Sequence, residues 1–328
     1  MEKSYDFIAI GDTVMDVFIK LSVGHIQESA VGSELCIPYG TKIPYEEAIQ
    51  VPAVGNSANA AVSASRLGLS SALISFLGSD EHGNQCLSRL KEEKVSTEFV
   101  TQEEGKLTNY HYVLWYGDDR TILIKHTAFT EKLPEDINAP KWIYLSSLGA
   151  NTEEFHAEIA EYAKTHPEVK LAFQPGTFQL KMGKDLEIYK YVEIVCMNKE
   201  EAQELLGTDE HEIKALLDGL QNLGPKTVII TDGHTGAYMK YENTYFNMPI
   251  YPDEKPPYDR TGAGDAFFST LVSYLAKGYD APYAIRRAPI NSMNVVQYVG
   301  AQEGLLSEEK IEGYLKKAPE NYKLTILE

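Results

Sequence analysis

The sequence predicts an α/β fold built on a mostly parallel sheet with helices on both faces. Short apolar runs, typical of buried strands, alternate with longer stretches of helical periodicity along most of the 328 residues. The length suits either about two structural units or one large α/β unit with an appendage. No low-complexity tract, internal repeat or linker divides the chain into tandem domains.

The expected strands and helices follow one another in a regular order. The first strand is the short apolar run DFIAI. Each later run has the length and composition of a strand, and each intervening stretch places its apolar residues at helical spacing. The expected strands are 6–10, 72–78, 141–147, 169–173, 192–197 and 226–231. The expected helices are 57–67, 80–94, 153–165, 199–206 and 210–222, followed by an apolar helix after Gly264.

Two segments, 19–50 and 108–126, depart from this alternation because no helix follows them. The second contains TNYHYVLWYGDDRTILIKH, which predicts two strands joined by the turn GDDR. We expect both segments to form a small β lid outside the main sheet. The α/β core, with the binding sites, then consists of residues 1–18, 51–107 and 127–328.

The charge balance limits the partners. Lys and Arg number 30 against 48 Asp and Glu, a net charge of −18, so we expect neither nucleic acid nor an anionic membrane surface as a partner. An anionic ligand must therefore be held by local groups. The segment MEKSYDFIAIGD lacks a signal-peptide pattern, and no run of about 18 apolar residues occurs. Cys36, Cys86 and Cys196 show no metal-binding spacing, so we expect a reduced, cytoplasmic location.

Polar or turn residues follow several of the predicted strands. In open α/β sheets ligands bind beyond the carboxyl ends of the strands, so these residues should line one crevice. The stretches concerned are GDTVMD, QPG, NKEE, DGHTG and DRTGAGD.

The stretch DRTGAGD at 259–265 stands at the mouth of an apolar helix. The backbone N–H groups of Gly262, Ala263 and Gly264 would form an anion site with the helix dipole behind them. Asp265 would then lie beside a bound phosphate, where a carboxylate can accept a hydroxyl proton. The residues alone allow a second interpretation, in which Asp265 caps the helix and the glycines form a turn.

DRTGAGDAFFSTLVSYL resembles the carboxy-terminal signature of the ribokinase-like (PfkB) sugar kinase family. The resemblance implies that Gly262, Ala263 and Gly264 form the anion hole and that Asp265 is the catalytic base. GDTVMD resembles the first turn of the family, whose last Asp, Asp16, holds substrate hydroxyls. The role of Asp12 stays open.

VGNSANAAVSASRLGL resembles the amino-terminal signature of the family. It implies that Asn59 contacts the sugar, with Gly55 in the same segment. Many members have Gly-Gly where this chain has Val54-Gly55, which leaves the extent of lid closure open.

Further matches fall on the nucleotide side. NKEE carries the Asn-x-x-Glu of the family as Asn198 and Glu201, which implies magnesium and phosphate placement, although the same pair also fits a helix capping box. TDGHTG matches the nucleotide-side turn. The residues concerned in this turn are Thr231, Gly233 and Gly236.

Two positions near these motifs depart from the family pattern. Gln174 occupies a position where Asp or Asn is common. Arg260 replaces Thr or Pro, and we expect it to contact ATP phosphate or to pair with Asp259. Asp259 matches a residue that in many members surrounds a monovalent cation, so K⁺ joins ATP and Mg²⁺ among the expected cofactors.

The resemblance implies an α/β ribokinase-like fold and an ATP-dependent kinase that phosphorylates a hydroxymethyl group of a small sugar. A nucleoside kinase on the same fold is the alternative, and a sugar-binding regulator without activity is a third hypothesis. The edge of the lid could pair two subunits into a homodimer.

Overall fold

The computed structural model describes residues 4–29, 32–117 and 119–327. Its centre is a ten-stranded sheet with the order β16-β15-β14-β13-β12-β11-β10-β1-β6-β7. The strands of this sheet are β1 (Phe7–Ile10), β6 (Ser71–Gly78), β7 (Val100–Glu103), β10 (Trp142–Leu145), β11 (Lys170–Phe173), β12 (Ile194–Asn198), β13 (Thr227–Thr231), β14 (Ala237–Tyr241), β15 (Thr244–Met248) and β16 (Thr325–Ile326). Strands β7 to β13 in this order are parallel, and β14, β15 and β16 are antiparallel to their neighbours.

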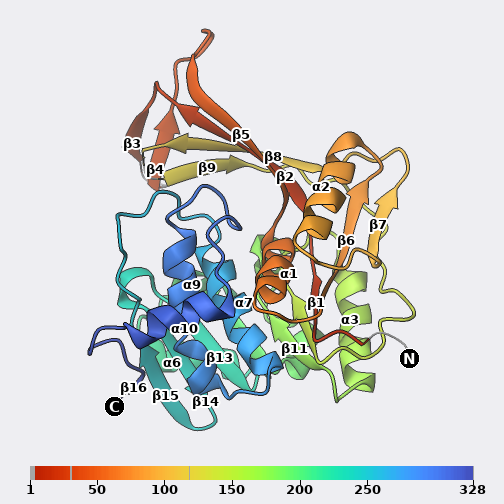
Figure 1. Ribbon diagram of the computed structural model, residues 1–328, viewed down its shortest axis with the longest axis vertical. Coiled ribbons are helices and arrows are strands. Elements are labelled where there is room, and N and C mark those ends of the chain that lie inside the picture. Colours follow the sequence, from red (N-terminus) through yellow and green to blue (C-terminus); the bar gives the residue numbers. More distant parts are fainter. Residues whose placement is uncertain (1–3, 30–31, 118, 328) are drawn as a thin grey trace.

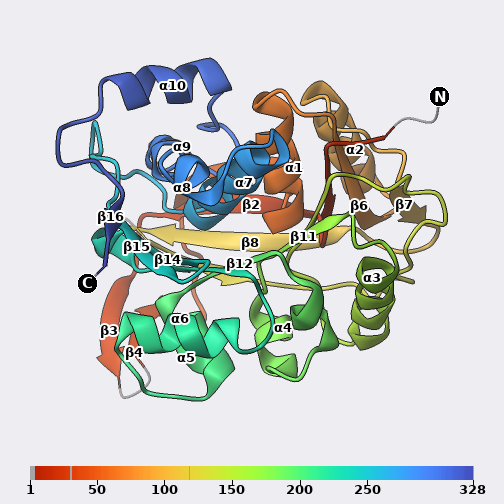
Figure 2. The same ribbon diagram turned by 90° about the horizontal axis from the view of Figure 1, so that it is seen from below.

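Helices cover both faces of the sheet, which confirms the predicted α/β class (Figure 2). One face carries α1 (Asn56–Arg66), α2 (Glu81–Glu92), α7 (Ala263–Ala276), α8 (Ala281–Ile285), α9 (Ala288–Val295) and α10 (Glu308–Lys316). The other face carries α3 (Glu153–Thr165), α4 (Thr177–Met182), α5 (Lys199–Leu206) and α6 (Ile213–Gln221). Two short 3₁₀ helices, Glu187–Tyr191 and Gly233–Thr235, connect strands and helices.

The two faces of the sheet form two separate cores. Along β1, Phe7 and Ala9 belong to the core beneath α1 and α7, whereas Ile8 and Ile10 belong to the core beneath α3 and α5. This alternation is what a strand buried on both faces requires. It explains why the strand sequences are apolar throughout instead of alternating.

The strand order changes direction between β1 and β10. The chain moves from β1 to β6 and β7 on one side and later from β10 to β13 on the other. Such a switch point leaves a crevice at the carboxyl ends of the two strands. Gly11 follows β1 there, and a Cβ at this position would lie 2.8 Å from Ser146 Oγ, just after β10.

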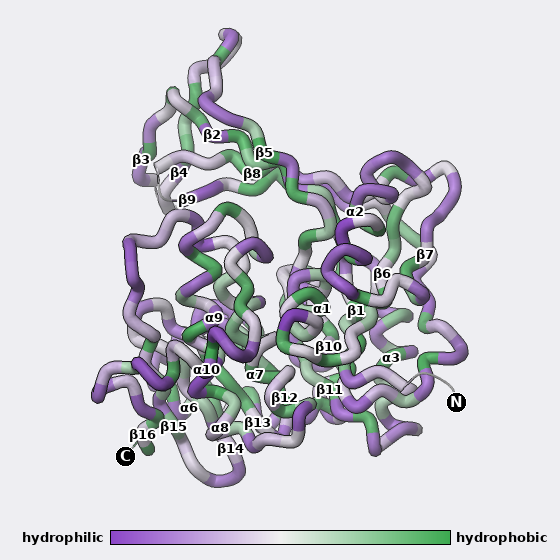
Figure 3. The backbone as a smooth tube through the Cα atoms, in the orientation of Figure 1, coloured by the Kyte–Doolittle hydropathy of each residue, from purple (hydrophilic) through white to green (hydrophobic). Residues whose placement is uncertain are grey.

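A second sheet stands outside the main one (Figure 1). It has the strand order β5-β2-β8-β9, with β2 (Val14–Leu21), β5 (Tyr45–Val54), β8 (Asn109–Tyr116) and β9 (Asp119–Leu123). A two-stranded hairpin, β3 (His25–Ser29) and β4 (Gly32–Cys36), lies beside it. Hydrophobic residues predominate along β2, β5 and β8 where these strands meet, and hydrophilic residues predominate in the outer loops (Figure 3).

The second sheet is larger than the segments 19–50 and 108–126 from which the sequence predicted a lid. Strand β2 pairs with β8 already from Val14, and β5 continues to Val54. The difference arises because only three residues separate the end of β1 from the start of β2, so the chain passes from the main sheet into the second sheet without a long connection. Its first half is buried and, apart from Asp16, apolar, so it resembles a core strand in sequence. No helix of the described residues is long and apolar enough to cross a membrane.

Candidate active site

Asp265 lies in the first turn of α7 with its side chain buried. Its Oδ2 accepts a hydrogen bond from Asn59 Nδ2 at 2.8 Å, and its Oδ1 accepts one from Gln174 Nε2 at 3.2 Å. Burial raises the pKa of the Asp265 carboxyl, and the two amide bonds lower it in part. The arrangement brings Asp265 and Asn59 together, 206 residues apart in sequence.

Gly262 and Gly264, which precede Asp265, differ in whether the fold requires glycine. Gly262 precedes α7 at φ 78°, and a Cβ there would lie 2.3 Å from the Ala301 Cβ, so the fold itself requires glycine. Gly264 has no positive φ, is exposed, and its Cβ would meet only Gln174 Nε2 at 3.7 Å. The fold therefore does not require glycine at 264, which leaves an open surface in front of the first N–H groups of α7.

A cavity of about 230 Å³ opens beside this helix terminus. Its walls combine small residues and apolar side chains with His234, Asp253 and Arg260. Five residues that the sequence placed on the nucleotide side or in the anion hole lie in its wall. They are Thr231, Gly233, Gly236, Ala263 and Gly264. Gly236 is required by the fold, because it has φ 100° and a Cβ would lie 2.2 Å from Met248 O.

Arg260 also lines this cavity and is exposed. Among the described residues Arg260 forms no ion pair with Asp259, so of its two expected contacts the structure does not support this one, and the contact with ATP phosphate stays a prediction. Asp259 is buried, and its carboxylate accepts bonds from Thr261 N at 2.9 Å, Thr261 Oγ1 at 2.7 Å and Gly300 N at 2.8 Å. These neutral donors occupy the carboxylate, whereas the charge of Arg260 acts on Asp253, where burial raises the pKa of the carboxyl and Arg260 lowers it in part. The cation role predicted for Asp259 stays a prediction.

Asn198 and Glu201 form a reciprocal capping box at the start of α5. Asn198 Oδ1 accepts from Glu201 N, and Glu201 Oε2 accepts from Asn198 N, both at 2.8 Å. Asn198 also lies opposite Thr231 in the parallel register of β12 and β13. The capping interpretation is thus confirmed, and the magnesium role remains a prediction compatible with it.

The surroundings of Glu201 suit a cation that is held mainly by other ligands. Burial and the nearby carboxylates of Glu200, Glu204 and Asp265 raise the pKa of Glu201. Within the described part of the chain, no three His, Cys, Asp or Glu residues are grouped to hold a metal. Mg²⁺ often keeps several waters and binds through one or two carboxylates plus substrate phosphates. The donor set therefore fits a phosphate-bound Mg²⁺ better than a closed protein site.

A second polar group lies where β1 passes into β2. Asp12 Oδ2 lies 3.1 Å from His126 Nδ1, and Asp16 Oδ1 lies 3.5 Å from His111 Nδ1. All four side chains are largely buried, and the Asp12 and Asp16 oxygens named have no hydrogen-bond partner among the described residues. Unpartnered buried oxygens of this kind are suited to accept hydroxyl groups of a ligand.

Burial and the nearby Asp259 raise the pKa of Asp16 to about 7. Burial and the neighbouring His126 lower the pKa of His111 to about 4, which keeps this imidazole neutral near neutral pH. No sequence pattern marks His111 or His126 as a site residue, because each is a single histidine in a strand or loop without a motif. Only the pairing of β8 with β2 places His111 beside Asp16.

Gly55, predicted on the sugar side, links α1 to this group. It has φ 112°, and a Cβ there would lie 2.5 Å from Asp12 O. The backbone thus approaches Asp12 more closely than any other residue type permits. Gly55 O also accepts from Asn59 N in the first turn of α1, so Gly55 connects Asp12 to the predicted substrate-side residue Asn59.

The fold is shared with solved kinases. The ribokinase of Arabidopsis thaliana, solved with ribose and ATP, superimposes with a TM-score of 0.80 over 96% of this chain and 99% of its own, at 19% identity. A nucleoside kinase of Methanocaldococcus jannaschii gives a TM-score of 0.76 over 96% of this chain and 100% of its own, at 20% identity. These likenesses show that the chain has the ribokinase-like fold, and its candidate site residues lie at the carboxyl ends of the strands.

Sequence similarity identifies the family. Residues 21–308 match the model of the pfkB family of carbohydrate kinases, and the chain belongs to this family. An ATP-dependent 6-phosphofructokinase of Thermoanaerobacterium thermosaccharolyticum is 27% identical over 262 residues, 75% of this chain and 80% of the relative. A ribokinase of Bacillus subtilis is 26% identical over 275 residues, 80% of this chain and 87% of the relative.

Proposed function

We propose that this carbohydrate kinase transfers the γ-phosphoryl group of ATP to a hydroxymethyl group of a small neutral sugar, with Asp265 as the base. The observation that carries this proposal is the position of Asp265 between two sites. The adjacent Gly264 lines the nucleotide-side cavity, while the Asp265 carboxylate contacts Asn59 on the substrate side. A hydroxyl and a phosphoryl group meet only at such a junction.

Asp265 accepts the proton of the substrate hydroxyl as that oxygen forms its bond to the γ-phosphorus. The bond from the γ-phosphorus to the bridging oxygen breaks, and ADP leaves with its electron pair. The N–H groups at the start of α7 stabilise the charge on the transferring group, with the helix dipole behind them. Asn198 and Glu201, together with the phosphates, would hold Mg²⁺, which would neutralise phosphate charge. Catalysis then consists chiefly of positioning and electrostatics.

The substrate-side group favours an uncharged acceptor. Asp12 and Asp16 form ion-pair contacts only with histidines among the residues described, and His111 is held neutral. Burial and the carboxylates of Asp12 and Glu103 also raise the pKa of Glu131 to about 7. A phosphorylated sugar would bring its negative charge toward these carboxylates, whereas sugar hydroxyls can donate to them.

A nucleoside is the second candidate acceptor. Phe178 packs edge-on against His126, with ring centroids 5.4 Å apart, beside the Asp12 carboxylate. A half-buried aromatic ring at this position could stack on a base while Asp12 and Asp16 hold the ribose. The relatives named ribokinase and the neighbour named nucleoside kinase are compatible with either acceptor.

A panel of pentoses, hexoses, nucleosides and fructose 6-phosphate with Mg-ATP, scored by ADP release, tests this function. We expect turnover with a neutral pentose or hexose and little with the sugar phosphate. Turnover confined to nucleosides would select the second candidate. Fructose 6-phosphate as the best acceptor would contradict the charge argument, and absence of substrate-dependent ADP release would contradict the activity itself.

We also propose a cytoplasmic location, a lid role for the second sheet and activation by K⁺. The free thiols of Cys36, Cys86 and Cys196 support a cytoplasmic location. The exposed side chains of the second sheet, among them Tyr112 and Ile122, support its role as a lid with an edge that pairs two subunits. Activation by K⁺ would require a cation beside Asp259.

A further inference from the structure

The Asp265 carboxylate is held by two side-chain amides, and the direction of each amide matters. Asn59 donates to Oδ2 and Gln174 donates to Oδ1. An amide turned by 180° would present its oxygen to the carboxylate and repel it. Something must therefore fix which end of each amide faces Asp265.

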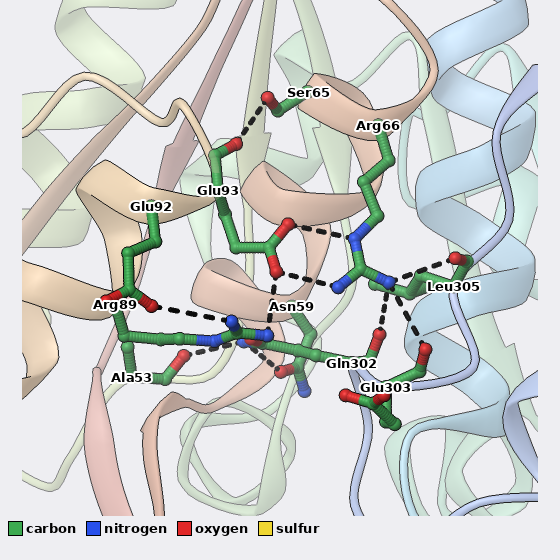
Figure 4. A network of polar contacts seen from close by, with 10 residues as sticks. All are labelled: Ala53, Asn59, Ser65, Arg66, Arg89, Glu92, Glu93, Gln302, Glu303 and Leu305. Carbon is green, nitrogen blue, oxygen red and sulfur yellow. Dashed lines mark hydrogen bonds and ion pairs between the residues drawn. The ribbon is translucent and has the colours of Figure 1, made fainter.

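Gln302 fixes the direction of Asn59 (Figure 4). Its Nε2 donates to Ala53 O at 2.6 Å, and a backbone carbonyl can only accept, so this end of Gln302 must be the nitrogen. The same Nε2 lies 3.1 Å from the Asn59 oxygen Oδ1. Asn59 must then turn its own nitrogen toward Asp265.

Gln302 is itself held firmly in place. It is only 2% exposed, and its backbone oxygen accepts from Arg66 NH1 at 2.7 Å. The same guanidinium group donates to Leu305 O at 3.0 Å and forms a two-pronged pair with Glu93 at 2.9 and 2.7 Å (Figure 4). Helix α1 thus anchors the loop that orients an amide of the same helix.

Tyr144 fixes the other amide. Its hydroxyl donates to Gln174 Oε1, and burial raises the pKa of this phenol well above its usual value, so it keeps its proton. Gln174 Nε2 is then directed at Asp265 Oδ1. Gln174 is one of the residues at which this chain departs from the family pattern, and here its longer side chain spans from Tyr144 to Asp265.

The two amides act on the protonation state of the Asp265 carboxyl group. Facing Asp265 are Tyr144 from β10 and Glu201 from α5, both acidic groups, with the neutral Asn59 from α1 and Gln174 after β11. Burial favours the protonated form of the Asp265 carboxyl group. The two amide donors are the groups that oppose this effect.

We propose that Gln302, acting through Asn59, and Tyr144, acting through Gln174, are positioning residues that keep the Asp265 carboxylate ionised and correctly aimed. Neither touches the substrate in this scheme. The proposal rests on the proposed function, in which Asp265 is the base. It assigns a role to Gln302, which no sequence motif indicated.

The test uses Gln302→Met, which keeps the volume and removes the donor. Without this donor Asn59 is no longer held with its nitrogen toward Asp265, and loss of that hydrogen bond to a charged group should lower kcat/KM for the sugar about 10- to 100-fold and shift the acidic limb of its pH profile upward by about one unit. KM for ATP should stay within about threefold of wild type. Gln297→Met is the matched control, because among the described residues the Gln297 side chain donates only to Lys255 O, and it should leave the pH profile unchanged.

A double-mutant cycle separates positioning from structural support. If Gln302 acts through Asn59, Gln302→Met should cost little further activity in an Asn59→Ala background. Additive losses, or a Gln302→Met enzyme with the wild-type acidic limb, would overturn the proposal. Tyr144→Phe tests the other amide by removing one hydroxyl, should shift the same limb upward, and decides the matter if Gln302→Met does not fold. Retained activity of Asp265→Asn would instead refute the proposed function, so the two failures are distinguishable.

Discussion

Gly264→Ala separates the requirements of the fold from those of the reaction. The added Cβ would meet only Gln174 Nε2, at 3.7 Å, and Gly264 has no positive φ. Alanine is preferred over glycine inside a helix by up to about 1 kcal/mol, so the free energy of unfolding should stay equal or rise. The same methyl group would stand in front of the N–H groups at the start of α7. Loss of one such donor costs about 10²- to 10³-fold in turnover, and we expect a loss of this size in kcat.

Thermal unfolding and steady-state kinetics of the same preparation measure both effects. Gly313→Ala in α10 is the matched control, because its Cβ would meet nothing within 4 Å. The control should change stability in the same direction and leave kcat unchanged. A Gly264→Ala enzyme with kcat within about threefold of wild type would refute the anion-hole assignment, since no such loss of transition-state stabilisation would have occurred.

Three further predictions address the other candidate residues. Asp265→Asn should lower kcat about 10²- to 10⁴-fold with ATP affinity retained by calorimetry, and unchanged turnover would show that Asp265 is not the base. Burial and Asp259 raise the pKa of Asp16 from 3.8 to about 7, so in this pH range the folded protein keeps a proton that the unfolded chain releases. The contribution of Asp16 to stability is therefore full below pH 3.8 and is lost as the pH rises to about 7. Asp16→Asn should therefore stabilise the protein relative to wild type more at pH 8 than at pH 4, while sugar binding is lost; parallel pH curves of unfolding free energy would speak against the raised pKa. Arg260→Thr should raise KM for ATP without changing KM for the sugar, whereas the control Arg286→Thr, at an exposed position, should change neither. Equal KM values for ATP in the wild type and both variants would leave Arg260 outside the nucleotide site.

Parallel strands could be predicted well from the sequence because both of their faces are buried. The run 72–78 corresponds to β6 at Ser71–Gly78, and the helical stretch 199–206 corresponds to α5 in full. Strands β14 and β15 escaped prediction because half-buried, polar-alternating sequences such as TYFNM carry a weaker signal. Their existence depends on pairing with β13 at the antiparallel end of the sheet.

Some contacts of the candidate site could likewise be predicted from the sequence, and others could not. Asp265 and Gly264 lie in one contiguous motif, so their proximity follows from the sequence. The contact of Gln302 with Asn59 spans 243 residues, and no local pattern encodes it. His111 and Asp16 likewise meet only because β8 pairs with β2 in one particular register. Such contacts depend on the tertiary fold, and only a structure reveals them.

The loop from Gly300 to Leu305 has a consequence for the order in which the enzyme becomes competent. This loop supplies Gly300 N to Asp259 and Gln302 to Asn59, and Ala301 packs against Gly262. A ribosome makes the chain from its amino terminus, so α1, the second sheet and the nucleotide-side strands emerge long before it. A nascent chain that ends at residue 299 would carry every residue assigned to catalysis and still lack the support for Asn59, the bond to Asp259 and the packing on Gly262. We therefore expect chains whose synthesis has not passed this loop to transfer phosphoryl groups more slowly than chains that include it.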